Sequence, residues 1–371
     1  MSDSRIRVAV VFGGRSSEHA ISCATAAGVL GAIDRDRYEV VPIGITPKGH
    51  WVLAADDPDR WALGTGSAGG RVGNELGPVA LALGEGRGGL ITGEPGEVPR
   101  ELGTVDVVFP LLHGPFGEDG TIQGLLELAG VPYVGSGVLA SAVGMDKHYM
   151  KAVLQDAGLP MGPHLTVAPG RWDRAPQEVT AAAADLGWPV FVKPARAGSS
   201  VGVSRAEGPD ELPRAMALAL AEDPKVLIEA AVVGREIEVA VLQGRDGGPP
   251  RTTMPGEIVV AAGEGFYDFE SKYIDPDAAE LSCPAVLPDE VTDQVRALAA
   301  ECFEALGCEG LARVDFFYTD DGRVLVNEIN TMPGFTPISM FPKLWQHAGM
   351  TYPDLISELI ELARHRPTGL R

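Results

Sequence analysis

The chain has 371 residues, of which 45% are hydrophobic, so it is long enough for two or three domains with sizeable cores. Its formal net charge of −21 at pH 7 argues against nucleic acid or an anionic membrane as the main partner, because both require a basic surface. Phosphate ligands remain compatible with this composition, since they need only a few local lysines and arginines.

The cysteines and the N-terminus predict a cytoplasmic location. Cys23, Cys283, Cys302 and Cys308 show neither CxxC spacing nor companion histidines. We interpret them as thiols of a reducing compartment rather than as a disulfide framework or a zinc site. The N-terminus leads almost directly into a strand without a signal-peptide core, and no apolar run is long enough to span a bilayer.

The first part of the chain is predicted to form an open parallel α/β sheet. Residues 5–12 (RIRVAVVF) are typical of a buried strand, and a glycine-rich turn and an alanine-rich helix at 20–32 follow it. Further strands are predicted at 38–46, 79–83, 90–91 and 105–114, a helix at 120–130, and a short strand and turn at 131–137. The pattern predicts a first domain over residues 1–140.

The rest of the chain is predicted to form an α+β central domain, 141–234, and a C-terminal domain, 235–371. The central domain is expected to contain helices at 145–158 and 209–222, two strands joined by a Gly/Ser loop within 189–205, and a strand at 225–232. The C-terminal domain is expected to contain a strand at 235–244, a helix at 288–307, a hairpin at 312–330 and a helix at 353–365.

The hairpin ARVDFFYTDDGRVLVNEIN, residues 312–330, contains the most informative polar residues. Asp-Gly between two β-rich runs predicts a tight turn, and a two-residue loop at 321–322 would place Asp315 opposite Glu328. The same count places Arg313 opposite Asn330, so that all four side chains share one face. Opposed carboxylates repel each other unless a cation lies between them.

Two interpretations of this hairpin are open: a solvated polar face on an edge hairpin, or a divalent-ion site. The apolar residues Val314, Phe316, Val326 and Ile329 between the polar ones favour the ion site. Asp, Glu and Asn oxygens suit Mg²⁺, which commonly binds one or two carboxylates together with phosphate oxygens. The hairpin therefore suggests Mg²⁺ with a nucleotide.

Three other segments carry candidate functional residues. Glu18 in GGRSSEHAIS lies at a helix start, where helix capping and ligand binding are both open. His113 in HGPFGEDGTIQG follows a strand end, the place where open α/β sheets bind ligands. Lys193 precedes a Gly-Ser-Ser-x-Gly loop that differs from the Walker pattern but could contact anionic oxygens.

These segments together resemble the D-alanine:D-alanine ligase family, which has a three-domain ATP-grasp fold. The resemblance runs the length of the chain and rests on the ordered set GGRSSEHAIS, HGPFGEDGTIQG, MDK, VKPARAGSSVGVS, EAAVVGREIEVAV, FYDFESKY, ARVDFF and NEINTMPGFTPISMFP. It implies ATP-dependent joining of two D-alanine molecules through an acyl phosphate, for peptidoglycan precursor synthesis. It also implies a homodimer.

The resemblance assigns residues to ATP and the metal. Asp315, Glu328 and Asn330 resemble the ligands of two Mg²⁺ ions, for which Mn²⁺ could substitute. The residues similar to phosphate-binding lysines are Lys147, Lys193 and Lys272. The positions similar to those that hold adenine and ribose are Glu229, Val232 and Glu236.

The resemblance also assigns residues to the amino acids. Glu18 resembles the residue that binds the first D-alanine's ammonium, with Ser199 and Tyr273 as its hydrogen-bonded partners, and His113 matches a residue nearby. Arg313 and the Gly334 backbone resemble the groups that stabilise the tetrahedral oxyanion. Ser339 and Met340 match positions at the second D-alanine's carboxylate. Residues 263–275 are the candidate lid.

Alternative functions remain open at this point. A ligase of the same fold could use D-lactate or D-serine as its second substrate, although Tyr273 favours D-alanine. A dinucleotide-binding oxidoreductase would require a full GxGxxG pattern, which the first turn lacks. A non-catalytic ATP-binding regulator would be expected to lack a metal ligand or Arg313, and all of these are present.

Overall fold

The computed structural model describes residues 5–62, 70–73, 77–83, 88–93, 98, 100–198, 200–260 and 279–366. The N-terminal sheet has the order β3-β2-β1-β7, with β1 parallel to both of its neighbours and β3 antiparallel to β2. Its strands are β1 (Ile6–Gly13), β2 (Tyr38–Ile45), β3 (Trp51–Leu53) and β7 (Val107–Pro110). The prediction of an open, largely parallel sheet is confirmed.

The remaining elements of this part surround the sheet. The helices are α1 (His19–Ala32), α2 (Pro58–Trp61), α3 (Thr121–Leu128) and α4 (Val138–Met145). A separate antiparallel sheet consists of β4 (Val79–Leu81), β5 (Gly89–Thr92) and β6 (Arg100–Thr104). The short strand predicted at 131–137 is reduced to an isolated parallel bridge between Val108 and Tyr133.

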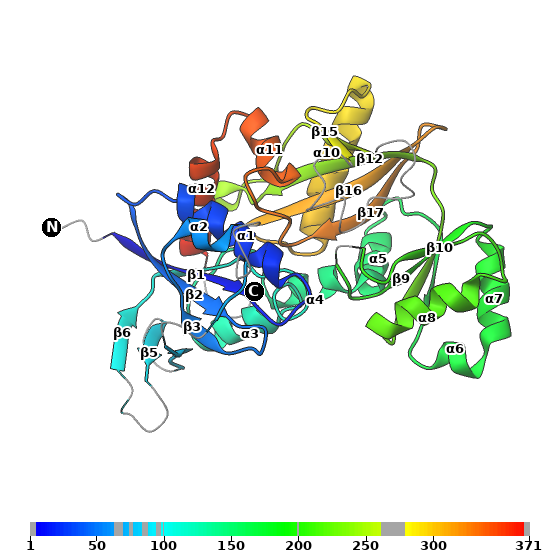
Figure 1. Cartoon of the computed structure of the whole chain (residues 1–371). Coiled ribbons are helices and arrows are strands. Elements are labelled where there is room, and N and C mark those ends of the chain that lie inside the picture. The colour runs from blue at the N-terminus through cyan, green and yellow to red at the C-terminus, as the bar shows by residue number, and fades with distance from the viewer. Residues whose placement is uncertain are drawn as a thin grey trace.

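The central sheet is antiparallel, with the order β10-β9-β11-β8. Its strands are β8 (His164–Val167), β9 (Val190–Pro194), β10 (Ser204–Ala206) and β11 (Val226–Ala230), and its helices are α6 (Arg171–Arg174), α7 (Pro176–Asp185) and α8 (Leu212–Glu222). Figure 1 shows this sheet and its helices at one end of the molecule and the N-terminal sheet at the other. The predicted pair of strands joined by a Gly/Ser loop is β9 and β10.

The third sheet lies between the other two and has the order β15-β14-β12-β16-β17, with β13 beside β12. Its strands are β12 (Gly234–Leu242), β13 (Arg251–Thr252), β14 (Gly256–Val260), β15 (Ala279–Ser282), β16 (Leu311–Thr319) and β17 (Val324–Asn330). The 3-10 helix η2 (Arg245–Gly247) follows β12, and α10 (Asp289–Ala305) packs on one face of the sheet. In the described ranges, none of the helices is both long and apolar enough to cross a membrane.

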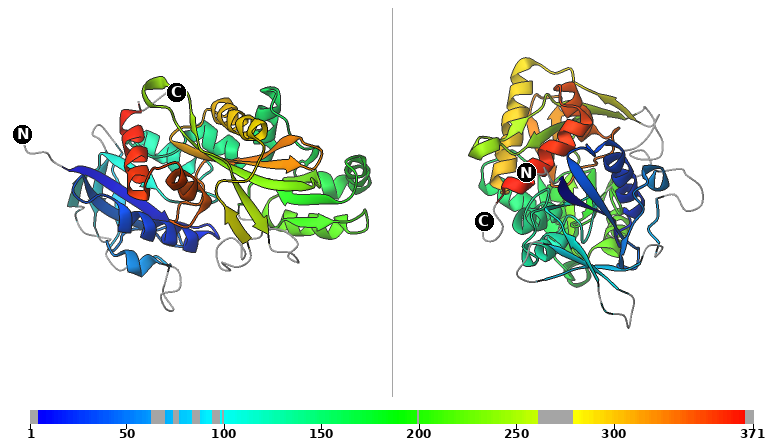
Figure 2. Two further views of the ribbon diagram at one scale, coloured as in Figure 1. Left: turned by 90° about the horizontal axis from the view of Figure 1, so that it is seen from above. Right: turned by 90° about the vertical axis from the view of Figure 1, so that its left-hand side faces the viewer.

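Two helices pack across the boundaries predicted from the sequence. Helix α5 (Lys147–Asp156) belongs to the 141–234 range, yet Met150 and Leu154 are buried in the core of the third sheet. Helix α12 (Tyr352–His365) ends the described chain and returns to the N-terminal sheet, as Figure 2 also shows. Each of these helices therefore packs against elements that lie far from it in the chain.

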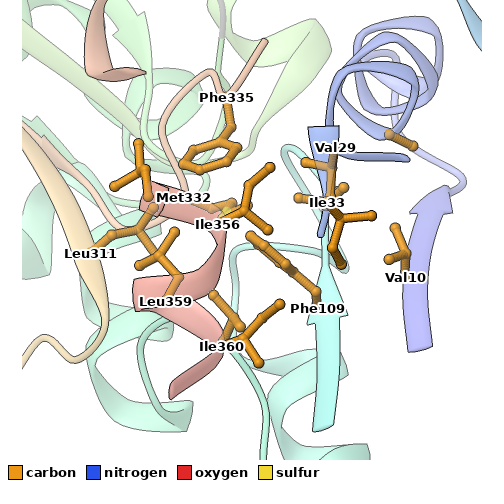
Figure 3. Close-up of a cluster of buried hydrophobic side chains, with 14 of the residues drawn as sticks. Val10, Val29, Ile33, Phe109, Leu311, Met332, Phe335, Ile356, Leu359 and Ile360 are labelled. Atoms are coloured by element: carbon orange, nitrogen blue, oxygen red, sulfur yellow. The ribbon is translucent and has the colours of Figure 1, made fainter. Parts of the chain in front are cut away.

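A single apolar cluster joins the two ends of the chain. Figure 3 shows residues of the C-terminal part beside residues of the N-terminal sheet and its first helix. The rings of Phe109 and Phe335 meet edge to face at a centroid distance of 5.9 Å. The Tyr352 hydroxyl donates to the Phe335 carbonyl at 2.7 Å, which anchors the segment after β17. That segment carries Gly334 and Ser339, so the cluster positions part of the site.

Residues 340–347 form helix α11 (Met340–His347), which is not among the elements expected for the C-terminal domain. Met340, Phe341, Leu344 and Trp345 recur with helical spacing and are buried on one face. Proline at 342 is tolerated because it lies in the first turn, where its missing N–H has no helical partner. Ser339 is the N-cap residue.

Candidate active site

One cavity of about 1170 Å³ is lined by the central sheet, the third sheet, helix α1 and the loop that follows β7. Thirteen of the residues proposed from the sequence line it: Glu18, His113, Lys147, Lys193, Glu229, Val232, Glu236, Arg313, Glu328, Asn330, Gly334, Ser339 and Met340. Asp315 lies directly behind this lining and is bonded to two of its members. Ser199, Lys272, Tyr273 and the whole proposed lid at 263–275 lie outside the described residues.

The cross-strand pairs predicted for the acidic hairpin are confirmed. Arg313 pairs with Asn330, and Asp315 pairs with Glu328, in the antiparallel ladder of β16 and β17. The alternating residue Val314 faces the apolar core on the opposite side of the sheet. The polar side chains therefore share the face that meets the cavity, and the interpretation as a solvated edge is wrong for these positions.

The loop at the tip of this hairpin differs from the prediction. Thr319 N donates to Arg323 O at 2.9 Å, so the loop has three residues, 320–322, rather than two. Gly322 closes it with a φ of 84°, as expected for the last residue of such a loop. A β-bulge farther along leaves Asn327 as an extra residue in β17. The longer loop and the bulge offset each other, so the pairing at the site is still the predicted one.

Arg313 lies between two carboxylates of adjacent strands. Its Nε and Nη2 each donate to Asp315 at 2.7 Å, and its Nε lies 3.2 Å from Glu238 Oε2 on β12. Glu238 and Asp315 are direct cross-strand partners. The guanidinium therefore compensates two nearly buried negative charges, and it is held in a fixed orientation at the cavity wall.

The hairpin provides ligands suited to a hard divalent ion. Asp315 and Glu328 present carboxylates on one face, and Asn330 Nδ2 donates to Asp315 Oδ2 at 3.0 Å. Among the described residues, no group of three His, Cys, Asp or Glu side chains gathers closely enough to hold a metal alone. Two carboxylates and one amide fit Mg²⁺, which usually completes its coordination with phosphate oxygens and water.

A chain of charged side chains links this hairpin to the central sheet. Lys147 Nζ lies 3.3 Å from Glu328 Oε2 and donates to the Ala197 carbonyl at 3.1 Å. Lys193 Nζ lies 2.6 Å from Glu229 Oε2. Burial alone would raise the pKa of the Glu229 carboxyl, but the neighbouring lysines outweigh it and hold this pKa well below its usual range.

Lys151 is the third lysine of this network, and sequence reasoning missed it. Its Nζ lies 3.0 Å from Glu229 Oε1, and only 4% of its side chain is exposed. The sequence contained a weak signal, because Lys147 and Lys151 are four residues apart and must share a helix face. That spacing is common on solvated helices, so only the packing of α5 shows that this face meets the site.

Glu18 occupies the N-cap position of α1 but makes no capping hydrogen bond with its side chain. A Cβ atom built on Gly114 would lie 2.4 Å from Glu18 Oε2, and one built on Gly198 would lie 3.0 Å from it. Glycine at these positions therefore makes room for the carboxylate between the loop after β7 and the loop after β9. This placement favours the ligand-binding interpretation of Glu18 over helix capping.

His113 and Glu118 lie beside Glu18 at the end of β7. Burial lowers the pKa of the His113 imidazole, although the Glu18 carboxylate opposes this, and its Nε2 lies 3.2 Å from Thr25 Oγ1. Burial, reinforced by Glu18, raises the pKa of Glu118 to about 8. Gly114 N donates to Glu118 Oε2 at 2.6 Å. Sequence reasoning missed Glu118, because a glutamate in a glycine-rich loop gives no sign of burial.

Ser339 and Thr336 close the opposite side of the cavity. Their hydroxyls are 2.7 Å apart, and Thr336 N donates to Ser339 Oγ at 3.2 Å. Gly334 lies just before this turn and lines the cavity. The buried ring of Phe335 holds the turn in place. The segment 334–339 therefore presents backbone and hydroxyl donors to the same space as Arg313.

The solved structures that resemble this one define the class of protein. The D-alanine–D-alanine ligase from Coxiella burnetii matches with a TM-score of 0.80 and 34% identity, covering 97% of this chain and 94% of that one. The VanG D-Ala:D-Ser ligase from Enterococcus faecalis matches with a TM-score of 0.80 and 33% identity, covering 97% and 100%. The fold is that of an ATP-grasp ligase.

Sequence comparison identifies the family within the ATP-grasp ligases to which the chain belongs. Two family models match, described as D-ala D-ala ligase N-terminus over residues 7–136 and D-ala D-ala ligase C-terminus over residues 153–361. The D-alanine–D-alanine ligase of Arthrobacter sp. (strain FB24) is 60% identical over 366 residues, covering 98% of this chain and 96% of the relative. That of Kineococcus radiotolerans is 57% identical and covers 100% of both chains. The chain belongs to the D-alanine–D-alanine ligase family.

Proposed function

We propose that this chain joins two molecules of D-alanine into D-alanyl-D-alanine, converting ATP to ADP and phosphate, and so supplies a precursor of peptidoglycan. The observation that carries this proposal is 60% identity over nearly the whole chain to a D-alanine–D-alanine ligase. The cavity supports it, because an acidic hairpin, several lysines and a buried arginine meet there. An oxidoreductase would not require this set of charges.

In this proposal the nucleotide lies between the central and third sheets. Lys147 and Lys193 bind phosphate oxygens, and Lys272 joins them from the undescribed segment. Glu229, Val232 and Glu236 hold the adenine and ribose. Asp315, Glu328 and Asn330 hold two Mg²⁺ ions, or Mn²⁺ in their place. When bound, these ions neutralise charge on the transferring phosphoryl group.

The first D-alanine lies beside the N-terminal sheet. Glu18 binds its ammonium group, with Ser199 and Tyr273 as partners of that carboxylate, and His113 lies next to it. The substrate carboxylate attacks the γ-phosphate of ATP to form D-alanyl phosphate. Lys147 and Lys193 stabilise the charge that develops on the phosphoryl oxygens during this step.

The second D-alanine binds at the start of α11. Ser339 and Met340 hold its carboxylate, which directs its amine toward the acyl carbon of D-alanyl phosphate. The amine attacks this carbon, and a tetrahedral oxyanion forms. The Arg313 guanidinium and the Gly334 N–H stabilise that oxyanion, after which phosphate leaves. Water must be excluded, since it would hydrolyse the acyl phosphate, and residues 263–275 are the proposed lid.

The test is phosphate release from ATP and Mg²⁺ with D-alanine alone, L-alanine alone, D-lactate plus D-alanine, and D-serine plus D-alanine, with products identified by mass. We expect D-alanine alone to give phosphate and D-alanyl-D-alanine in equal amounts. Turnover only with a mixed pair would retain the ligase chemistry and replace the second substrate, an outcome that the similarity to the VanG D-Ala:D-Ser ligase makes relevant. Folded protein that binds ATP but turns over no pair would contradict the proposal.

Four features of the proposal rest on the sequence and the family. We propose a homodimer, a cytoplasmic location, and three domains at 1–140, 141–234 and 235–371. We also propose that Tyr273 selects D-alanine as second substrate. Sedimentation measures whether the chain is a homodimer. Turnover of the Tyr273→Phe variant with D-lactate as second substrate tests the role proposed for Tyr273.

A further inference from the structure

Helix α5 holds β17 at the β-bulge that carries the proposed metal ligand Glu328. Lys151 Nζ donates to the carbonyl of Asn327, the extra residue of the bulge, at 3.1 Å. Ile329 N donates to Met150 Sδ at 3.4 Å. Both neighbours of Glu328 in the chain are therefore bonded to consecutive residues of α5, Lys151 and Met150.

The β-bulge in β17 leaves backbone groups that require hydrogen-bond partners outside the ladder of β16 and β17. The extra residue in a bulged strand has no partner opposite it, so its backbone groups must find other partners. Among the described residues β17 is also the last strand of its sheet, and beyond it Met161 forms an isolated bridge to Val326, whose N–H donates to the Pro160 carbonyl at 2.8 Å. Lys151 supplies a charged donor to the Asn327 carbonyl.

The same ammonium group also contacts the proposed nucleotide site. Lys151 Nζ lies 3.0 Å from Glu229 Oε1, and Lys193 Nζ lies 2.6 Å from Glu229 Oε2. Each oxygen of the carboxylate therefore faces one lysine. With a side chain only 4% exposed, Lys151 depends on these protein partners to compensate its charge.

We propose that Lys151 is a positioning residue for ATP and its metal, an inference that rests on the proposed function. It holds the bulge that sets the place of Glu328, and it shares Glu229 with Lys193. The three charges of Lys151, Glu229 and Lys193 sum to +1. Without Lys151, Glu229 and Lys193 form a neutral pair, and Lys193 attracts phosphate less strongly.

The test compares ATP binding by the full chain and its Lys151→Met variant, measured by titration calorimetry with and without Mg²⁺. We expect the variant to bind ATP about tenfold to a hundredfold more weakly, the range for losing one charge-assisted hydrogen bond. The Mg²⁺ concentration for half-maximal turnover should rise as well. KM for D-alanine should stay within about twofold, because the amino-acid residues are untouched.

Arg251→Met is a control for removing one of two cations from a buried carboxylate, although the Arg251 side chain is 33% exposed against 4% for Lys151. Arg251 shares the buried carboxylate of Glu358 with Arg245, and it donates to the carbonyl of Gln243 at 3.0 Å. Its arrangement thus repeats that of Lys151, but none of these residues lines the cavity. We expect Arg251→Met to lower the melting temperature and leave ATP binding as in the unmodified chain.

Lys151→Arg completes the set, because arginine retains the charge and several donors. We expect it to recover most of the ATP affinity lost in Lys151→Met. If Lys151→Met does not fold, Lys151→Gln provides the same comparison with a milder change. ATP affinity equal to that of the unmodified chain in these neutral variants, or a loss matched by Arg251→Met, would overturn the inference. An unmodified chain that binds no ATP would instead contradict the proposed function.

Discussion

Replacing Arg313 by methionine removes the cation that lies between Asp315 and Glu238. Methionine retains an unbranched apolar stem, so the change mainly removes the guanidinium. Asp315 then loses two donors at 2.7 Å, and its cross-strand neighbour Glu238 loses a cation at 3.2 Å. Two nearly buried carboxylates are left directly opposite each other on adjacent strands.

The size of the effect follows from this burial. The Arg313 side chain is 17% exposed, and those of Asp315 and Glu238 are 13% and 6% exposed. Removing one partner of a buried ion pair costs about 3–5 kcal/mol, and we expect the lower end because Arg313 retains some solvent contact. Loss of the proposed oxyanion donor should also reduce kcat by about 10² to 10³.

Urea unfolding and phosphate release measure the two effects separately. If repulsion between the carboxylates of Asp315 and Glu238 causes the loss of stability, adding Glu238→Gln to the Arg313→Met variant should restore part of the lost free energy of unfolding. The double-mutant cycle should then give a coupling free energy of about 0.5–3 kcal/mol. Additivity of the two substitutions, within about 0.5 kcal/mol, would refute this electrostatic reasoning.

Three further predictions concern Glu118, two glycines and the metal. Burial and the Glu18 carboxylate raise the pKa of Glu118 from 4.5 to about 8, so the folded state loses this group's contribution to stability as pH rises between those values. Thermal unfolding should therefore show the unmodified chain losing stability with rising pH relative to the Glu118→Gln variant. A stability difference that does not change with pH would contradict this. Gly114→Ala should raise KM for D-alanine, because the φ of Gly114 is 71° and the added Cβ would lie 2.4 Å from the Glu18 carboxylate. Gly124 lies in α3, where an added Cβ would have no heavy atom within 4 Å. Gly124→Ala should therefore stabilise the fold by about 0.5–1 kcal/mol and leave KM unchanged. ATP should raise the melting temperature with Mg²⁺ and much less with a chelator; equal shifts in both would argue against the metal ligands proposed here.

The sequence by itself determined the face of the acidic hairpin that carries the polar side chains. Strand alternation placed Asp315 and Glu328 on one face, since a buried face permits only one alternation of apolar and polar residues. Their predicted pairing is found because the longer loop and the bulge offset each other. The same local patterns predicted β1, α1 and α10, where long periodic runs leave little choice of element. Thirteen predicted residues meet at one cavity, as the resemblance implied.

Only the tertiary structure decided the loop length, the bulge and the residues behind the site. A three-residue loop and a two-residue loop both accept Asp-Gly, and the bulge that compensates at Asn327 depends on α5 lying beside β17. Lys151 and Glu118 are charged residues in segments that resemble ordinary surface sequence. The burial of Lys151 and the partial burial of Glu118 result from contacts between elements far apart in the chain, and local pattern contains no information about such contacts.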